Sequence, residues 1–108
     1  MVREITVQDL SGRLSRGEEY VLVDVREPEE HAFAVLPDSI LMPMNELPQR
    51  WNELEDDSGK EIIVYCHHGI RSRRAAGFLE QCGLRLVYSL AGGIDAWSRL
   101  IDAKVPRY

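Results

Sequence analysis

Apolar residues follow two kinds of pattern, which alternate along the chain. Short apolar runs predict strands at residues 20–25, 39–42, 61–65 and 86–90, and the nearly continuous run at 20–25 predicts a strand buried on both faces. Apolar residues at helical spacing, with capping residues, predict helices from Thr6 to near Gly17, over 29–34, from Asn45 through Leu54, from Ser72 to Gly83, and directly after Gly92-Gly93. This alternation predicts an α/β fold with a mainly parallel central sheet flanked by helices.

Length and composition favour one compact domain over residues 1–108. The chain is 44% hydrophobic and 29% charged, which is close to ordinary globular usage and excludes a disordered chain. Its apolar runs fall short of the roughly 20 residues that a membrane helix needs, and its start lacks the apolar stretch of a secretory signal. We therefore expect a cytoplasmic protein with no membrane partner.

The charge is unevenly distributed along the chain. The formal net charge is −5, which argues against a nucleic-acid partner. The window 66–74 carries +3, so the remaining residues sum to −8. This concentration predicts a binding site for a small anion at that window. Two cysteines are too few for a disulfide framework, and we expect both to be reduced.

The strongest candidate for chemistry is Cys66, which directly follows the predicted strand at 61–65. Ligands of parallel sheets gather at the carboxyl ends of strands. The loop from Cys66 to Arg71 spans six positions, and Gly69 permits the tight curl of amides that binds anions. An ordinary cysteine is only about 3% thiolate at neutral pH. A helix N-terminus together with one or two amide hydrogen bonds would make the thiolate the major form, so we expect a nucleophile here.

Three motifs together resemble single-domain rhodaneses over nearly the whole chain: residues 22–27 around Asp24-Val25-Arg26, the Cys-x-x-Gly-x-Arg-Ser loop at 66–72, and residues 92–97. The resemblance implies a rhodanese-like three-layer fold and a sulfurtransferase that needs no cofactor. Cys66 would take a sulfane sulfur from a small anionic donor such as thiosulfate and hold it as a persulfide. It would then pass the sulfur to cyanide, a thiol or a sulfur-carrier protein.

The same resemblance assigns roles to the residues around Cys66. Arg71 would bind the anionic group of the donor. The backbone amides of five residues would cradle the outer sulfur: His67, His68, Gly69, Ile70 and Arg71. Apart from the resemblance, Asp24 and Arg26 could orient the catalytic loop through salt bridges or hydrogen bonds, but structural support is favoured. Ser72 is expected to be a further supporting residue.

One segment departs from the family pattern. Where relatives usually have Gly-His-Ile followed by Gly-Ala, this chain has Ala34-Val35-Leu36-Pro37-Asp38-Ser39. The histidine is replaced by Val35, an apolar residue that can only pack. We expect the substitution to alter the wall of the site or a turn beside it.

Other residues near the loop allow more than one interpretation. Cys82 shares a predicted helix face with Phe78 and Leu79, which favours core packing over a role as a resolving thiol. His67 and His68 either shape the mouth of the loop, where partial protonation would attract an anion, or are solvated bystanders. We expect no metal site, because adjacent histidines rarely converge on one ion and no further histidine or cysteine stands at ligand spacing.

Two rival functions remain open. Cell-cycle-type dual-specificity phosphatases resemble this fold and also use a loop cysteine and arginine, but they place five residues between the two. Here four residues separate Cys66 from Arg71, and the shorter loop favours a single sulfur atom over a phosphate group. The second rival is a non-catalytic rhodanese-like binding module, although such modules often lack the cysteine.

Overall fold

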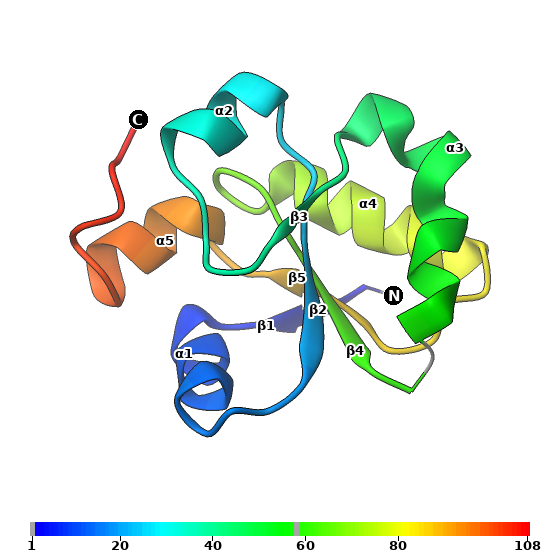
Figure 1. Ribbon diagram of the computed structural model, residues 1–108, viewed down its shortest axis with the longest axis horizontal. Coiled ribbons are helices and arrows are strands. Elements are labelled where there is room, and N and C mark those ends of the chain that lie inside the picture. The colour runs from blue at the N-terminus through cyan, green and yellow to red at the C-terminus, as the bar shows by residue number, and fades with distance from the viewer. Residues whose placement is uncertain (1, 58) are drawn as a thin grey trace.

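The computed structural model describes residues 2–57 and 59–108. Within them, five strands form one sheet in the order β1-β5-β4-β2-β3, and each neighbouring pair is parallel (Figure 1). The strands are β1 (Arg3–Ile5), β2 (Tyr20–Asp24), β3 (Ile40–Leu41), β4 (Glu61–Tyr65) and β5 (Val87–Leu90). The α-helices are α1 (Val7–Ser15), α2 (Pro28–Phe33), α3 (Leu47–Arg50), α4 (Ile70–Gln81) and α5 (Gly93–Leu100).

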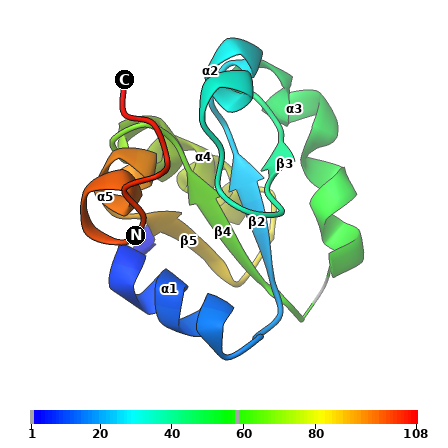
Figure 2. The ribbon, with the colours of Figure 1, turned by 60° about the vertical axis from the view of Figure 1, so that its left-hand side comes forward.

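The central strands are apolar on both faces because helices cover both sides of the sheet. Alternate residues of a strand point to opposite faces. Val23 and Val64 belong to the core shared with α3 and α4, whereas Leu22 and Ile63 belong to the core shared with α1 and α5. Figure 2 shows α1 and α5 on one side of the sheet and α3 on the other. The predicted α/β fold with three layers is confirmed.

Most predicted elements are present within a residue or two of the predicted bounds. Thr6 caps α1 by accepting a hydrogen bond from the amide of Asp9 at 3.1 Å, as its sequence position predicted. The strand β1 was not predicted from the sequence. This edge strand is three residues long and exposes two of them, so the sequence contains no apolar run that predicts a strand there.

Two helix predictions were wrong in their details. The segment predicted as one helix from an Asn45 cap through Leu54 is instead a 3₁₀ turn (Met44–Glu46), the short helix α3, and a 3₁₀ helix (Trp51–Asp57). The chain turns at Pro43, whose carbonyl accepts hydrogen bonds from the amides of Glu46 and Leu47, so Asn45 lies inside the turn and caps nothing.

The helix predicted to begin at Ser72 begins at Ile70. The left-handed backbone of Gly69, with φ of 103°, ends the preceding loop and serves as the N-cap. Arg71 is therefore part of the first turn of α4 and not of the loop. At the other end, the cap is Cys82, and Gly83 follows it with a positive φ.

The carboxyl ends of β2, β4 and β5 lie at one edge of the sheet, because the strands are parallel. The segments that follow them, α2, the loop before α4, and the start of α5, therefore meet at this edge (Figure 1). A search of the described residues finds no helix with the length and apolar character needed to cross a membrane.

Candidate active site

Cys66 follows the last residue of β4 and is only 1% exposed. Its sulfur accepts hydrogen bonds from two backbone amides, that of Gly69 at 3.1 Å and that of Ser72 at 3.3 Å. Both amides belong to the loop and first turn that open α4, a helix of 12 residues whose N-terminal end carries partial positive charge. These contacts stabilise negative charge on the sulfur.

Ser72 adds a side-chain contact to this environment. Its hydroxyl lies 3.6 Å from the Cys66 sulfur and 2.7 Å from the hydroxyl of Ser89, a buried residue of β5. Ser72 itself is fully buried. The two hydroxyls connect the sulfur to the neighbouring strand, and the supporting role of Ser72 stays a prediction.

The start of α5 is hydrogen-bonded to the backbone of the loop that begins at Cys66. The amide of Ile94 donates to the carbonyl of Cys66 at 2.9 Å, and the amide of Asp95 donates to the carbonyl of His67 at 3.0 Å. A Cβ atom on Gly93 would collide with both of these carbonyls. The Gly92-Gly93 pair therefore lets the backbone of α5 approach the backbone of the cysteine loop.

Arg71 is held by Glu30 of α2. The two guanidinium nitrogens Nη1 and Nη2 donate to Oε1 and Oε2 of the carboxylate at 2.7 and 2.9 Å. The hydrogen bonds that Arg71 donates to Glu30, with smaller contributions from the charges of Glu30 and Cys66, raise the pKa of Arg71. The predicted anion-binding residue is thus near the sulfur, and a carboxylate of the protein already occupies its guanidinium.

Asp24 and Arg26 form a fully buried ion pair at the end of β2. The Nε and Nη2 atoms of Arg26 each donate to a different oxygen of Asp24 at 2.8 Å, and Nη2 also donates to the carbonyl of Ala34 at 2.6 Å. The Asp24 carboxylate is also contacted by the backbone amide of Arg26 at 3.0 Å, by the hydroxyl of Tyr65 at 3.2 Å and by the Nδ1 atom of His31 at 2.8 Å. The pair connects β2 to the segment that follows α2, and its role in structural support stays a prediction.

His67 is packed between two rings. It stacks on Tyr108 with ring centroids 3.8 Å apart and an interplanar angle of 6°, and its centroid lies 3.9 Å from that of His68. Burial, and then the neighbouring His68, lower the pKa of His67, so its imidazole is neutral at physiological pH. The contact with Tyr108 argues against a solvated bystander, and the lowered pKa disfavours the protonated form of His67, whereas its shaping of the loop mouth stays a prediction.

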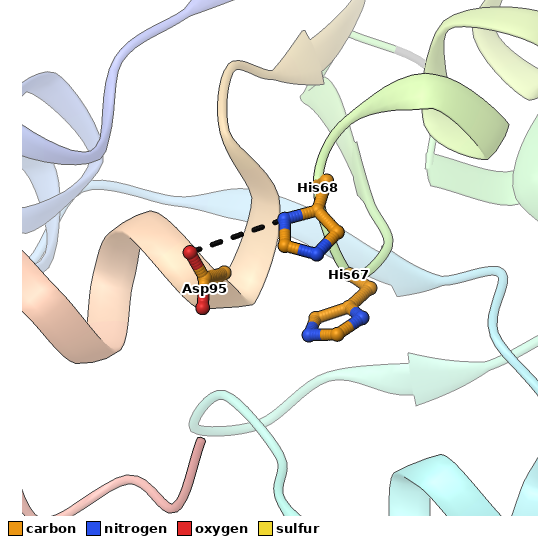
Figure 3. A group of neighbouring side chains, drawn as sticks. All are labelled: His67, His68 and Asp95. Atoms are coloured by element: carbon orange, nitrogen blue, oxygen red, sulfur yellow. Dashed lines mark ion pairs between the residues drawn. The ribbon is translucent and has the colours of Figure 1, made fainter. Parts of the chain in front are cut away.

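His68 is more exposed and faces the first turn of α5, where its Nδ1 atom lies 3.9 Å from the carboxylate of Asp95 (Figure 3). One ligand atom from each of His67, His68 and Asp95 lies within 4.8 Å of the others, so these three residues could hold a metal ion. The Asp95 carboxylate, however, accepts hydrogen bonds from Arg99 and Arg107 at 3.0 and 3.1 Å. Those two cations compete with any metal for the carboxylate, and the expectation of no metal stays a prediction.

The residue that departs from the family pattern lies at the surface. Val35 is 42% exposed, whereas its neighbours Ala34 and Leu36 are buried. Val35 lies in the segment between α2 and β3 with its side chain at the surface, so it does not form a wall of the site. The other expectation, an altered turn beside the site, stays a prediction. Cys82 is half-buried, at the opposite end of α4 from Cys66.

Three residues of the site were missed by the sequence analysis: Glu30, His31 and Tyr108. Glu30 had one local signal, since it is the third residue of a helix whose cap is Glu27, and the two form a capping box. That signal explains a helix start but not a contact with Arg71. Tyr108 has no local signal at all, because its partners Arg26 and Glu30 are 82 and 78 residues away along the chain.

The Glu30–Arg71 pair predicts a specific dependence of stability on pH. Hydrogen bonds from Arg71, with others from the Glu27 amide and Tyr108, lower the pKa of Glu30 from 4.5 to about 2. The pair therefore stabilises the fold fully above about pH 4.5, and this contribution is lost as the pH falls through about 2. We expect the melting temperature of the wild type to exceed that of Glu30→Gln by a constant amount near neutral pH.

This difference should shrink only between about pH 4.5 and pH 2. Thermal unfolding of both proteins across this range measures it, and the other carboxylates largely cancel in the comparison. A difference that is absent at neutral pH, or that disappears well above pH 4.5, would contradict the proposed pairing.

The chain is similar to known proteins over most of its length. The family model of the rhodanese-like domain matches residues 6–100. A sulfurtransferase from Allochromatium vinosum is 41% identical over 99 residues, which cover 92% of this chain and 91% of that protein.

Solved structures show the same relationship. A rhodanese-related protein from Thermoplasma volcanium superposes with a TM-score of 0.79 at 38% identity, over 96% of this chain and 95% of that one. A rhodanese-like domain protein from Staphylococcus aureus gives a TM-score of 0.83 at 27% identity, over 99% of both chains. The chain therefore belongs to the rhodanese-like domain family, in which it is similar to a protein named a sulfurtransferase.

Proposed function

We propose that this protein transfers sulfane sulfur through a persulfide on Cys66. The observation that carries the proposal is the environment of the Cys66 sulfur, which accepts hydrogen bonds from the amides of Gly69 and Ser72 at the N-terminal end of α4. Two amide donors and a helix N-terminus direct partial positive charge at the sulfur, and the thiolate is the form of cysteine that attacks sulfur.

The reaction balances without an oxidant or reductant. The Cys66 thiolate attacks the outer sulfur of thiosulfate, a sulfur–sulfur bond forms to the enzyme, and the original sulfur–sulfur bond breaks. Sulfite leaves with the bonding electron pair, and the enzyme holds a persulfide. Cyanide or a thiolate then attacks the outer sulfur and displaces the Cys66 thiolate, giving thiocyanate or a new persulfide.

The residues after Cys66 would position the donor. Arg71 offers a planar guanidinium that matches two oxygens of an anionic group. The amides of His67, His68, Gly69, Ile70 and Arg71 would surround the outer sulfur. For Ile70 this role belongs to the backbone alone, because its side chain is 60% exposed.

The direct test is mass spectrometry of the intact protein and of its peptides after incubation with thiosulfate and then with cyanide. We expect a gain of one sulfur atom, about 32 Da, on the peptide that contains Cys66, and its removal by cyanide with release of thiocyanate. If thiosulfate gives no gain, the same test with an alkyl persulfide decides the matter. Failure with both donors would refute the proposed function.

The phosphatase alternative is tested on the same protein. The four-residue spacing between Cys66 and Arg71 favours a sulfur atom over a phosphate group, so we expect no turnover of an aryl phosphate. Hydrolysis of the aryl phosphate that depends on Cys66, in a protein that forms no persulfide, would favour the phosphatase.

A further inference from the structure

Glu30 occupies the position on Arg71 that a donor's anionic group would need. The contact uses both carboxylate oxygens and two guanidinium nitrogens, at 2.7 and 2.9 Å. It is partly shielded from water, since the side chains of Glu30 and Arg71 are 20% and 35% exposed. A carboxylate and the sulfonate-like end of thiosulfate bind a guanidinium in the same way, so the two compete for Arg71.

The carboxylate of Glu30 is held in place from two further directions. Its Oε1 atom accepts a hydrogen bond from the amide of Glu27 at 3.0 Å, in the capping box of α2. Its Oε2 atom accepts a hydrogen bond from the hydroxyl of Tyr108 at 2.8 Å. Burial raises the pKa of Tyr108 to about 12, so this hydroxyl remains protonated and able to donate.

Tyr108 is in turn connected to the core. Its hydroxyl oxygen accepts a hydrogen bond from Nη1 of Arg26 at 2.8 Å, and Arg26 is fixed by its buried ion pair with Asp24. The ring of Tyr108 stacks on His67, in the loop that follows Cys66. Glu30 is therefore a positioned group, and displacing it from Arg71 disturbs contacts on three sides.

We propose that Glu30 is a specificity-determining residue that lowers the affinity of the site for compact, doubly charged donors such as thiosulfate, relative to alkyl persulfides, which have no oxyanion group and carry at most one negative charge. A dianion must take Arg71 from Glu30 and then bind beside a carboxylate that keeps its negative charge. An alkyl persulfide has no oxygens to place on the guanidinium and leaves the Glu30–Arg71 pair intact. This inference rests on the proposed sulfur transfer through Cys66.

The test compares Glu30→Gln with wild type, using thiosulfate and a donor that has no oxyanion group, 2-hydroxyethyl persulfide. Glutamine has nearly the same shape, and it can serve in a capping box, so α2 keeps its start while the charge is removed. We expect kcat/KM for thiosulfate, measured by thiocyanate release, to rise about fivefold. The rate at which 2-hydroxyethyl persulfide loads a sulfur atom onto Cys66 should stay within about twofold. This rate is measured by mass spectrometry without cyanide, because cyanide attacks a free persulfide directly.

The matched control is Glu29→Gln. Glu29 is the neighbouring residue on α2, is exposed, and its substitution changes the net charge by the same amount. We expect it to leave both donors nearly unaffected, which separates competition at Arg71 from the general field of the protein. An equal rise in Glu29→Gln would overturn the inference.

A second variant, Tyr108→Phe, keeps the charge of Glu30 but removes the hydroxyl that holds it. We expect a smaller rise in kcat/KM for thiosulfate, in the same direction. Suppose that the wild type forms the Cys66 persulfide but thiosulfate activity is unchanged or lower in both Glu30→Gln and Tyr108→Phe. This result would refute the role of Glu30 and leave the proposed function standing. A wild type that forms no persulfide with either donor would refute the proposed function, and the inference with it.

Discussion

Replacing Cys66 with serine should abolish sulfur transfer while leaving the fold intact. A serine hydroxyl is not ionised at neutral pH and cannot carry a persulfide, so we expect activity to fall by at least about a thousandfold. The fold should survive because the amides of Gly69 and Ser72, which now donate to sulfur at 3.1 and 3.3 Å, can donate to the new oxygen. Thiocyanate release measures the activity, and the mass of the protein after incubation with thiosulfate shows the intermediate.

Cys82→Ser is the matched control for this substitution. Cys82 caps the far end of α4, a helix of 12 residues and therefore about 18 Å in length. We expect Cys82→Ser to form the persulfide and to transfer sulfur at close to the wild-type rate. Full transfer in Cys66→Ser would disprove the mechanism. A persulfide on Cys82 in the wild type would show that the chemistry belongs to Cys82 and not to Cys66.

Replacing Gly93 with alanine should damage both stability and activity. Gly93 has φ of 59°, and a Cβ atom there would collide with the carbonyl oxygens of Cys66 and His67. These are the same carbonyls that accept hydrogen bonds from Ile94 and Asp95, so α5 would have to move away from the cysteine loop. We expect a loss of about 3 kcal/mol or more in the free energy of unfolding, from backbone strain and overpacking together.

Urea unfolding measures this loss, and the transfer assay measures the effect on the site. Gly17→Ala is the control, because Gly17 has a similar φ of 68° but has no atom within 4 Å of an added Cβ. Strain alone should cost that variant about 1 kcal/mol and leave transfer unchanged. If Gly93→Ala were no less stable than Gly17→Ala, the fold would not depend on the close approach of α5 to the carbonyls of Cys66 and His67.

Much of the fold was predictable because its signals are local. The apolar runs that became β2, β4 and β5 are short and nearly continuous, which is what a strand covered on both faces requires. β1 escaped prediction because it is an edge strand with two exposed residues. The region after Pro43 was mispredicted because a proline-initiated turn and two 3₁₀ segments show almost the same apolar spacing as one continuous helix.

The candidate site also combines residues that local sequence brings together with residues that only tertiary contacts bring together. Cys66, Gly69 and Ser72 lie within one continuous segment, and a strand followed by a glycine-containing loop and a helix brings their atoms together through local geometry alone. The amino-acid pattern was therefore enough to predict the α/β fold and the position of the candidate nucleophile at the carboxyl end of a strand.

Only the tertiary structure decided what surrounds that loop. Arg71 and Glu30 are 41 residues apart, and Tyr108 reaches Glu30 across 78 residues, so no local spacing relates them. The contact of Gly93 with the carbonyls of Cys66 and His67 likewise depends on how α5 packs against the loop. Such contacts form when separate elements dock at one edge of the sheet, and a pattern that records only neighbours along the chain does not contain them.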